Sequence, residues 1–110
     1  MENYMTVITS LEEFDKAFAS DRVSVFTFSA EWCPDCQFIK PFMPKLVEAY
    51  KDYDFYYIDR DKSMDVCQKA MVMGIPSFVA SKDGKELNRF VSKFRKTEKE
   101  IDEFLSGLQK

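Results

Sequence analysis

Two cysteines separated by two residues, Cys33 and Cys36, are the side chains of this 110-residue chain with the clearest capacity for chemistry. A disulfide between them would close within one helical turn and would enclose almost no chain, so it would add little stability. Such a pair opens and closes with little backbone movement, which suits thiol–disulfide exchange better than structural cross-linking. The neighbouring Trp32, Pro34 and Asp35 complete the segment, which predicts a redox site.

The composition is that of an acidic, aromatic-rich chain with enough apolar residues for one ordinary core. Hydrophobic residues make up 45% of the sequence, aromatic residues 15%, and the net charge is −3. These values exclude a disordered chain. Because no broad basic surface is expected, we predict neither nucleic acid nor a membrane as a partner. The length fits a single domain over residues 1–110.

Histidine, the commonest metal ligand and general base, is absent from the sequence. The third cysteine, Cys67, is remote from the pair, so one chain lacks the four ligands of a structural zinc site. No dinucleotide-binding pattern occurs, and we expect no metal or cofactor. Residues 1–4 lack the basic start of a secretory signal, and no apolar run reaches the ~20 residues of a membrane helix. We therefore expect a cytoplasmic protein.

Hydrophobic spacing and turn residues predict elements in the order β-α-β-α-β-α-β-β-α. The predicted strands are 5–8, 23–28, 53–58, 77–80 and 87–91, and the predicted helices are 10–18, 33–50, 63–73 and 97–108, with a kink at Pro41 in the second helix. Alternating units indicate an α/β fold whose central mixed sheet is mostly parallel, with an antiparallel closing hairpin and about four flanking helices. Chemistry in such sheets lies beyond the carboxyl ends of strands, where the second predicted strand leads into the cysteine pair.

The position of Cys33 at the start of the second predicted helix favours its thiolate form. Free N–H groups of the first turn, including that of Cys36, can donate to a sulfur at the cap. The helix dipole favours a negative charge there by ~0.3–1 kcal/mol. Asp35 is open to two interpretations, as an ordinary acid at a helix start or as the group that handles the proton of Cys36.

Several segments together resemble the thioredoxin family over essentially the whole chain. They are Ala30-Glu31-Trp32-Cys33-Pro34-Asp35-Cys36, Pro41 in the following helix, Ile58-Asp59 at the end of a strand, and Gly74-Ile75-Pro76. The preceding strand and the downstream Ile-Pro make this combination more specific than a Cys-x-x-Cys motif alone. The resemblance implies the thioredoxin fold.

The resemblance also implies a role for each matching residue. Cys33 would be the exposed attacking thiolate, and Cys36 would be the resolving thiol that releases the mixed disulfide. Pro76 would be a cis proline that faces the pair. Ile75 would help to form a docking edge for the substrate backbone, and Trp32 would cover one side of the site.

Three departures from the family pattern concern proton transfer and substrate docking. Thr27 occupies the position, six residues before the first cysteine, where the family usually has a buried acid. Phe55 occupies the position of the usual lysine, and the loop at 92–94 lacks the usual glycine. Asp35, Glu31 or water would then have to accept the proton of Cys36, and the bulkier loop would narrow the substrate range.

The leading interpretation is a cytoplasmic thiol–disulfide oxidoreductase that reduces disulfides of proteins or small molecules. By resemblance, a thioredoxin reductase would supply the electrons. A monomer is the default expectation. One alternative is a disulfide oxidant or isomerase. Another is an interaction module with the same fold, in which Cys33 and Cys36 have no redox turnover.

Two further groups of residues are interpreted structurally. We expect Cys67 to be a small core residue, with a regulatory thiol as the alternative. We expect the same core role for three methionines, Met64, Met71 and Met73. The basic stretch formed by Lys93, Arg95 and Lys96 reads as a solvated loop, with docking of acidic partners as the alternative.

Overall fold

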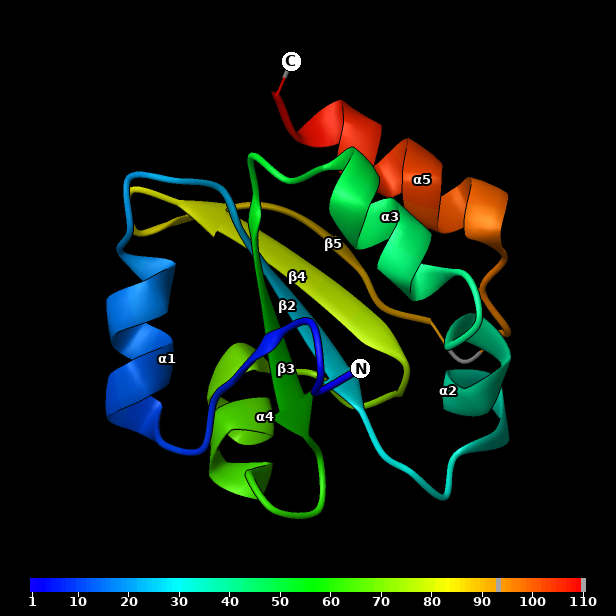
Figure 1. The fold of residues 1–110 in the computed structure, drawn as a ribbon. Helices are drawn as coiled ribbons and strands as arrows, with labels where there is room; N and C mark the ends of the chain where they lie inside the picture. The colour runs from blue at the N-terminus through cyan, green and yellow to red at the C-terminus, as the bar shows by residue number, and fades with distance from the viewer. Residues whose placement is uncertain (93, 110) are drawn as a thin grey trace.

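A computed structural model describes residues 1–92 and 94–109. A five-stranded mixed sheet with the order β1-β3-β2-β4-β5 forms its centre (Figure 1). The strands are β1 (Thr6–Val7), β2 (Ser24–Ser29), β3 (Asp54–Asp59), β4 (Ser77–Lys82) and β5 (Lys85–Phe90). β3 is parallel to β1 and β2, whereas β4 is antiparallel to β2 and β5. The mixed sheet with its closing hairpin confirms the predicted α/β class.

Helices cover both faces of this sheet. They are α1 (Leu11–Phe18), α2 (Pro34–Ile39), α3 (Met43–Ala49), α4 (Met64–Ala70) and α5 (Glu98–Ser106), followed by a 3-10 turn, η1 (Gly107–Gln109). α1 and α4 pack on one face, and α3 and α5 pack on the other (Figure 1). None of the helices in the described part of the chain combines the length and the apolar character needed to span a membrane.

The predicted long helix 33–50 is two helices, so the expected kink at Pro41 is a complete break. α2 ends at Ile39, and α3 begins at Met43 after Phe42, which has no side-chain cap. The break has a physical cause, because Pro41 has no N–H to donate and its ring clashes with the carbonyl group one turn earlier. Pro44 then lies in the first turn of α3, where proline is tolerated.

β2 is the centre of the core, since all six of its residues are buried. Its two faces contribute to separate apolar clusters, with Val25 on the side of α3 and α5 and Phe26 on the side of α1 and α4. Thr27 pairs with Tyr57 of β3 and with Phe78 of β4. The strand that leads into the cysteine pair is therefore held on both edges and both faces.

Cys67 and the three methionines that were predicted to share a core role differ in their burial. Cys67 is buried in the core, as predicted. The prediction of a core position is wrong for Met64, Met71 and Met73, which are 50%, 73% and 88% exposed. For Met71 and Met73 the reason is the early end of α4 at Ala70, after which Met71 adopts a left-handed conformation (φ 56°) and Val72 is the residue that enters the core. Met64 is the first residue of α4, and its side chain is exposed there.

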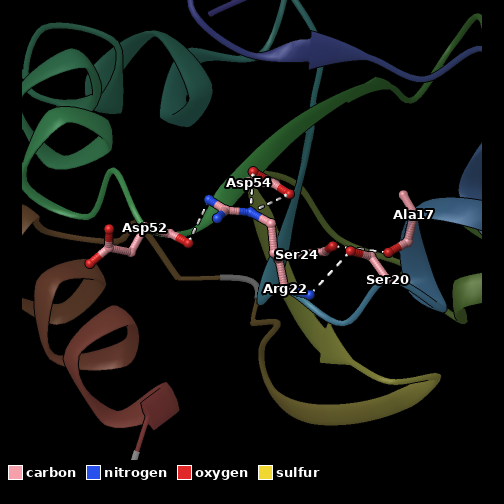
Figure 2. Close-up of polar contacts among 6 residues, drawn as sticks. All are labelled: Ala17, Ser20, Arg22, Ser24, Asp52 and Asp54. Atoms are coloured by element: carbon pink, nitrogen blue, oxygen red, sulfur yellow. Dashed lines mark hydrogen bonds and ion pairs between the residues drawn. The ribbon is translucent and has the colours of Figure 1, made fainter.

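Arg22 ties together the starts of β2 and β3, at the end of the sheet away from the cysteines. Its Nε donates to both carboxylate oxygens of Asp54, at 3.1 and 3.0 Å, and one terminal nitrogen donates to the carbonyl oxygen of Asp52. Nearby, the hydroxyl of Ser24 donates to the carbonyl oxygen of Ala17 in α1 (Figure 2). These contacts connect strand and helix ends that are distant in sequence.

Candidate active site

The cysteine pair lies where β2 gives way to α2, at the carboxyl end of the central strand. Cys33 is the N-cap of α2, and its sulfur accepts a hydrogen bond from the N–H of Cys36 at 3.3 Å. Pro34 occupies the first turn, as expected. Both cysteines are free thiols in this structure. The cap geometry predicted from the sequence is therefore present, with the two sulfur-bearing residues facing each other across one turn.

Cys33 is less accessible than the sequence suggested. Only 5% of its surface is exposed, and Cys36 is 1% exposed. The thiol of Cys33 donates to the carbonyl oxygen of Ile75 at 3.8 Å, and Ile75 packs against both cysteines. The Ile75 loop and the first turn of α2 therefore both contact Cys33.

The segment before β4 forms the opposite wall of the site. The peptide bond between Ile75 and Pro76 is cis. The hydroxyl of Ser77 donates to the carbonyl oxygen of Gly74, which closes the turn. The carbonyl oxygen of Ser92 lies 3.4 Å from where a Cβ atom of Gly74 would be, so the strand-end loop after β5 packs closely behind this wall.

Trp32 forms an exposed flank of the site. It is 60% exposed, and its indole N–H donates to a carboxylate oxygen of Asp61 at 2.5 Å. The guanidinium of Arg60 lies 5.9 Å from the centre of the indole ring. Sequence analysis did not identify Arg60 or Asp61, which follow β3 and carry no recognisable motif.

Asp35 is held by a residue from the far end of the chain. Its Oδ1 accepts a hydrogen bond from Nε of Arg95 at 2.8 Å. The same guanidinium lies 4.6 Å from the ring centre of Phe38 in α2. The loop before α5 is thereby fixed against α2. Arg95 is solvent-exposed, as predicted, but it also forms an ion pair that the sequence did not indicate. Lys93 lies outside the described residues.

For Lys96 the prediction of a solvated loop is wrong, because this residue is only 1% exposed. Its Nζ donates to the carbonyl oxygen of Ser92 at 3.1 Å and lies 5.1 Å from the ring centre of Phe90. The sequence held one signal of this burial. Lys96 immediately precedes Thr97, the N-cap of α5, and the residue before a cap often packs against the helix as an apolar staple.

The surroundings of Cys36 favour its protonated form. Burial, followed by the hydrogen bond with Cys33, raises the pKa of the Cys36 thiol to about 11. The hydroxyl of Ser29 and the backbone of Ala30 act in the opposite direction on this pKa. Cys36 therefore holds its proton at neutral pH and must lose it before it can act as a nucleophile.

Thr27 and Phe55, which replace the family's usual buried acid and lysine, provide no ionisable group near the cysteines. Thr27 is fully buried, and its hydroxyl has no hydrogen-bond partner among the described residues. Phe55 belongs to the apolar core. A polar cavity of about 220 Å³ reaches Cys36 from the other side, and its lining includes Glu31 and Lys40. This cavity is large enough to hold water next to the buried thiol.

No group of three or more cysteine, aspartate or glutamate side chains suited to a metal ion occurs in residues 1–92 and 94–109.

A sequence model of the Thioredoxin family matches residues 5–106. The chain belongs to the thioredoxin family. It is 42% identical over 88 residues to thioredoxin-2 of Saccharomyces cerevisiae, with 79% of this chain and 85% of that protein covered. It is 36% identical over 101 residues to a thioredoxin of Callithrix jacchus, covering 89% and 96% of the two chains.

Solved thioredoxin structures share this fold. Mitochondrial thioredoxin 3 of Saccharomyces cerevisiae, in its oxidised form, superposes with a TM-score of 0.83 at 28% identity and covers 94% of this chain and 95% of its own. Thioredoxin of Fasciola hepatica gives a TM-score of 0.82 at 29% identity, covering 93% and 97%. The thioredoxin fold expected from the sequence is confirmed, and the protein is a thiol–disulfide oxidoreductase of this family.

Proposed function

We propose that this protein is a cytoplasmic reductant of disulfides that works through a mixed disulfide with its substrate. The observation that carries the proposal is the 3.3 Å hydrogen bond from the N–H of Cys36 to the sulfur of Cys33 at the cap of α2. A donor aimed at this sulfur stabilises the thiolate, which is the nucleophile in disulfide exchange.

The proposed cycle transfers two electrons in two displacements. The Cys33 thiolate attacks one sulfur of the substrate disulfide, and the other substrate sulfur leaves as a thiolate that takes a proton from solvent. Cys36 then loses its proton and attacks the Cys33 sulfur. The mixed disulfide breaks, the second substrate sulfur leaves and is protonated, and the protein retains the Cys33–Cys36 disulfide.

The surroundings of the pair support separate binding roles. Ile75 lies against the attacking sulfur, so its backbone is proposed to align the substrate next to Cys33. Pro76 is proposed to shape this edge. Trp32 offers an exposed apolar surface on the opposite flank, where it would cover the substrate. The bulky loop at 92–94 is proposed to narrow the range of substrates.

Asp35 remains our proposed acceptor for the Cys36 proton, and water in the polar cavity is the competing acceptor. Asp35 lies in the first turn of α2 together with Cys36, and Arg95 fixes its carboxylate. The cavity borders the same thiol from the side of Glu31. The buried hydroxyl of Thr27 is too weakly basic to accept a proton from a thiol, so it is not a candidate.

A reductase of the thioredoxin system is the proposed electron donor, and the protein is proposed to act as a monomer. The odd number and the spacing of its cysteines suit a reducing compartment such as the cytoplasm, and Cys67 is buried. One structural neighbour comes from work on thiol resolution in a yeast mitochondrial 1-Cys peroxiredoxin, with a TM-score of 0.83 at 27% identity. A thiol peroxidase is therefore one candidate substrate.

The deciding measurement is the reduction potential of the pair in a Cys67→Ser background, by equilibration with dithiothreitol and glutathione buffers. A value below about −230 mV supports a reductant, because thioredoxin lies near −270 mV. A value above about −180 mV would indicate a disulfide oxidant or isomerase. If no reversible two-electron couple appears, the redox proposal fails and an interaction module is favoured.

Serine substitutions test the two cysteine roles separately. Cys36→Ser should accumulate a mixed disulfide through Cys33, because the attacking thiol remains and the resolving thiol is lost. Cys33→Ser should form none, since the remaining Cys36 is buried and protonated. Equal trapping by both variants, measured by mass spectrometry under non-reducing conditions, would contradict the assignment.

A further inference from the structure

Lys96 is the one charged side chain among the buried residues that the structure describes. Burying an ammonium group is costly unless it is compensated. Within residues 1–92 and 94–109, no carboxylate oxygen lies within the 4.0 Å ion-pair distance of its Nζ. Among these residues its Nζ donates to the carbonyl oxygen of Ser92 and lies over the face of the Phe90 ring. These contacts alone give little reason for a buried charge.

The helix that follows Lys96 gives no reason either. A cation at the N-terminal end of α5 opposes the helix dipole. The chain is fixed on both sides of the lysine, because Arg95 pairs with Asp35 and Thr97 forms a capping box with Glu100. Lys96 is thus held with its side chain directed inward, where an apolar residue would satisfy the fold at lower cost.

The contacts of Lys96 lead directly to the cysteine pair. Its Nζ binds the carbonyl oxygen of Ser92, which packs against Gly74. Gly74 precedes Ile75, whose own carbonyl oxygen accepts a hydrogen bond from the thiol of Cys33. The ammonium group therefore lies behind the wall that lines the reacting sulfur.

The charges that act on Lys96 belong to the same site. Burial lowers the pKa of Lys96, and the negative charges of Asp35, Cys36, Glu100 and Cys33 act in the opposite direction. Glu100 belongs to the cap of α5, so its charge stays the same during the redox cycle. Asp35 is paired with Arg95 and is neutral only while it carries the Cys36 proton, so its charge is the same at the start and at the end of the cycle. The two sulfurs do change, because a disulfide is neutral and a reduced pair carries a thiolate.

We propose that the ammonium group of Lys96 stabilises the thiolate form of the Cys33–Cys36 pair and so favours the dithiol over the disulfide. The inference rests on the redox function proposed above. Reduction of the disulfide takes two electrons and, where one sulfur remains a thiolate, one proton, and Lys96 compensates the charge that this leaves. Because Lys96 acts through the cysteines and touches no substrate, it is a positioning residue.

The first test compares Lys96→Met with Lys45→Met in a Cys67→Ser background. Methionine keeps an unbranched side chain of similar length, and Lys45 is a matched control because its side chain is 73% exposed and paired with Glu98. We expect Lys96→Met to shift the equilibrium with dithiothreitol toward the disulfide by at least about fivefold at pH 7. The same variant should slow alkylation of Cys33 by a similar factor, and Lys96→Arg should restore both.

A structural role predicts a different result, in which Lys96→Met changes the free energy of unfolding but leaves the equilibrium within twofold of Lys45→Met. That result would overturn the proposal. It is distinct from failure of the redox function itself, which would appear as the absence of a reversible couple in the protein with Lys96 intact, and which would overturn both.

A second measurement needs no substitution of Lys96 and so does not depend on how a variant folds. The ¹³Cε resonance of Lys96 is titrated in the oxidised and in the reduced protein. Coupling between two sites is reciprocal, so a lysine that favours the thiolate must have a higher pKa in the reduced protein. Identical titration curves in the two redox states would overturn the proposal.

Discussion

The buried thiol of Cys36 gives the reduced protein a specific pH dependence. Its pKa is raised to about 11, whereas an unfolded thiol titrates near ~8.5. Between these values the folded state holds more protons than the unfolded state, so stability falls as pH rises. Urea unfolding at pH 8, 9 and 10 should show a loss of up to ~1.4 kcal/mol per pH unit from this group. Cys36→Ala should remove that component, and equal pH slopes in both proteins would contradict it.

Asp35 provides a second test at the scale of one side chain. If Asp35 accepts the Cys36 proton, Asp35→Asn should slow the step in which Cys36 releases the substrate from the mixed disulfide. We expect this step to be slower by ~10-fold, which is less than the ~10²–10⁴-fold typical of a general base. The loss is limited because water in the adjoining cavity can take over. Rapid mixing of the protein with a small disulfide measures attack and release separately. Unchanged release in Asp35→Asn, with slowed release in Glu31→Gln, would assign the proton to the cavity instead.

Helix α5 depends on the capping box at its first turn. Thr97 accepts a hydrogen bond from the N–H of Glu100 at 3.2 Å, and Glu100 accepts one from the N–H of Thr97 at 3.0 Å. Thr97→Ala should lower the free energy of unfolding by ~1 kcal/mol, because the N–H of Glu100 loses its acceptor. Thr97→Ser keeps the hydroxyl and serves as the control. Urea unfolding compares the unchanged protein with the Thr97→Ala and Thr97→Ser variants. A Thr97→Ala variant with the same free energy of unfolding as the unchanged protein would rule out this contribution.

Loss of the Arg22 contacts that connect the starts of β2 and β3 should lower the stability of the protein without changing its redox chemistry. The Arg22 side chain is 52% exposed, so its ion pair with Asp54 is screened by solvent and salt (Figure 2). Arg22→Met should therefore cause a small fall in the urea midpoint that shrinks as salt is added. The equilibrium of the cysteine pair should not change, because Arg22 lies at the opposite end of the strands. A shifted redox equilibrium would show that the two ends are coupled.

As a whole molecule, the protein is predicted to unfold as one domain. The apolar clusters on the two faces share the same sheet, and the radius of gyration is 12.5 Å, close to the ~13 Å of a compact 100-residue domain. Urea unfolding followed by far-ultraviolet circular dichroism and by Trp32 fluorescence should give coincident transitions. Light scattering should give the 12.9 kDa mass of a monomer. Separated transitions or a larger mass would contradict these predictions.

Features that depend on neighbouring residues in the chain were predictable from the sequence. The cap at Cys33, the capping box at Thr97 and the interruption at Pro41 each depend on backbone groups within one or two turns. Alternating strands and helices likewise predicted a mixed sheet with the site at the carboxyl end of β2. The motif around Cys33, together with Ile75 and Pro76, was sufficient to predict the family.

Only the tertiary structure decided which side chains are withdrawn from water and which charges meet. Arg95 pairs with Asp35 across 60 residues of sequence, Lys96 is buried behind the site, and Met73 is exposed although it is apolar. Cys33 is enclosed because the Ile75 loop packs over it. The free energy of a buried charge depends on the groups that surround it in space, and no local pattern contains that information. The amino-acid sequence thus determined the reacting groups, and the packing of distant segments determined their electrostatic environment.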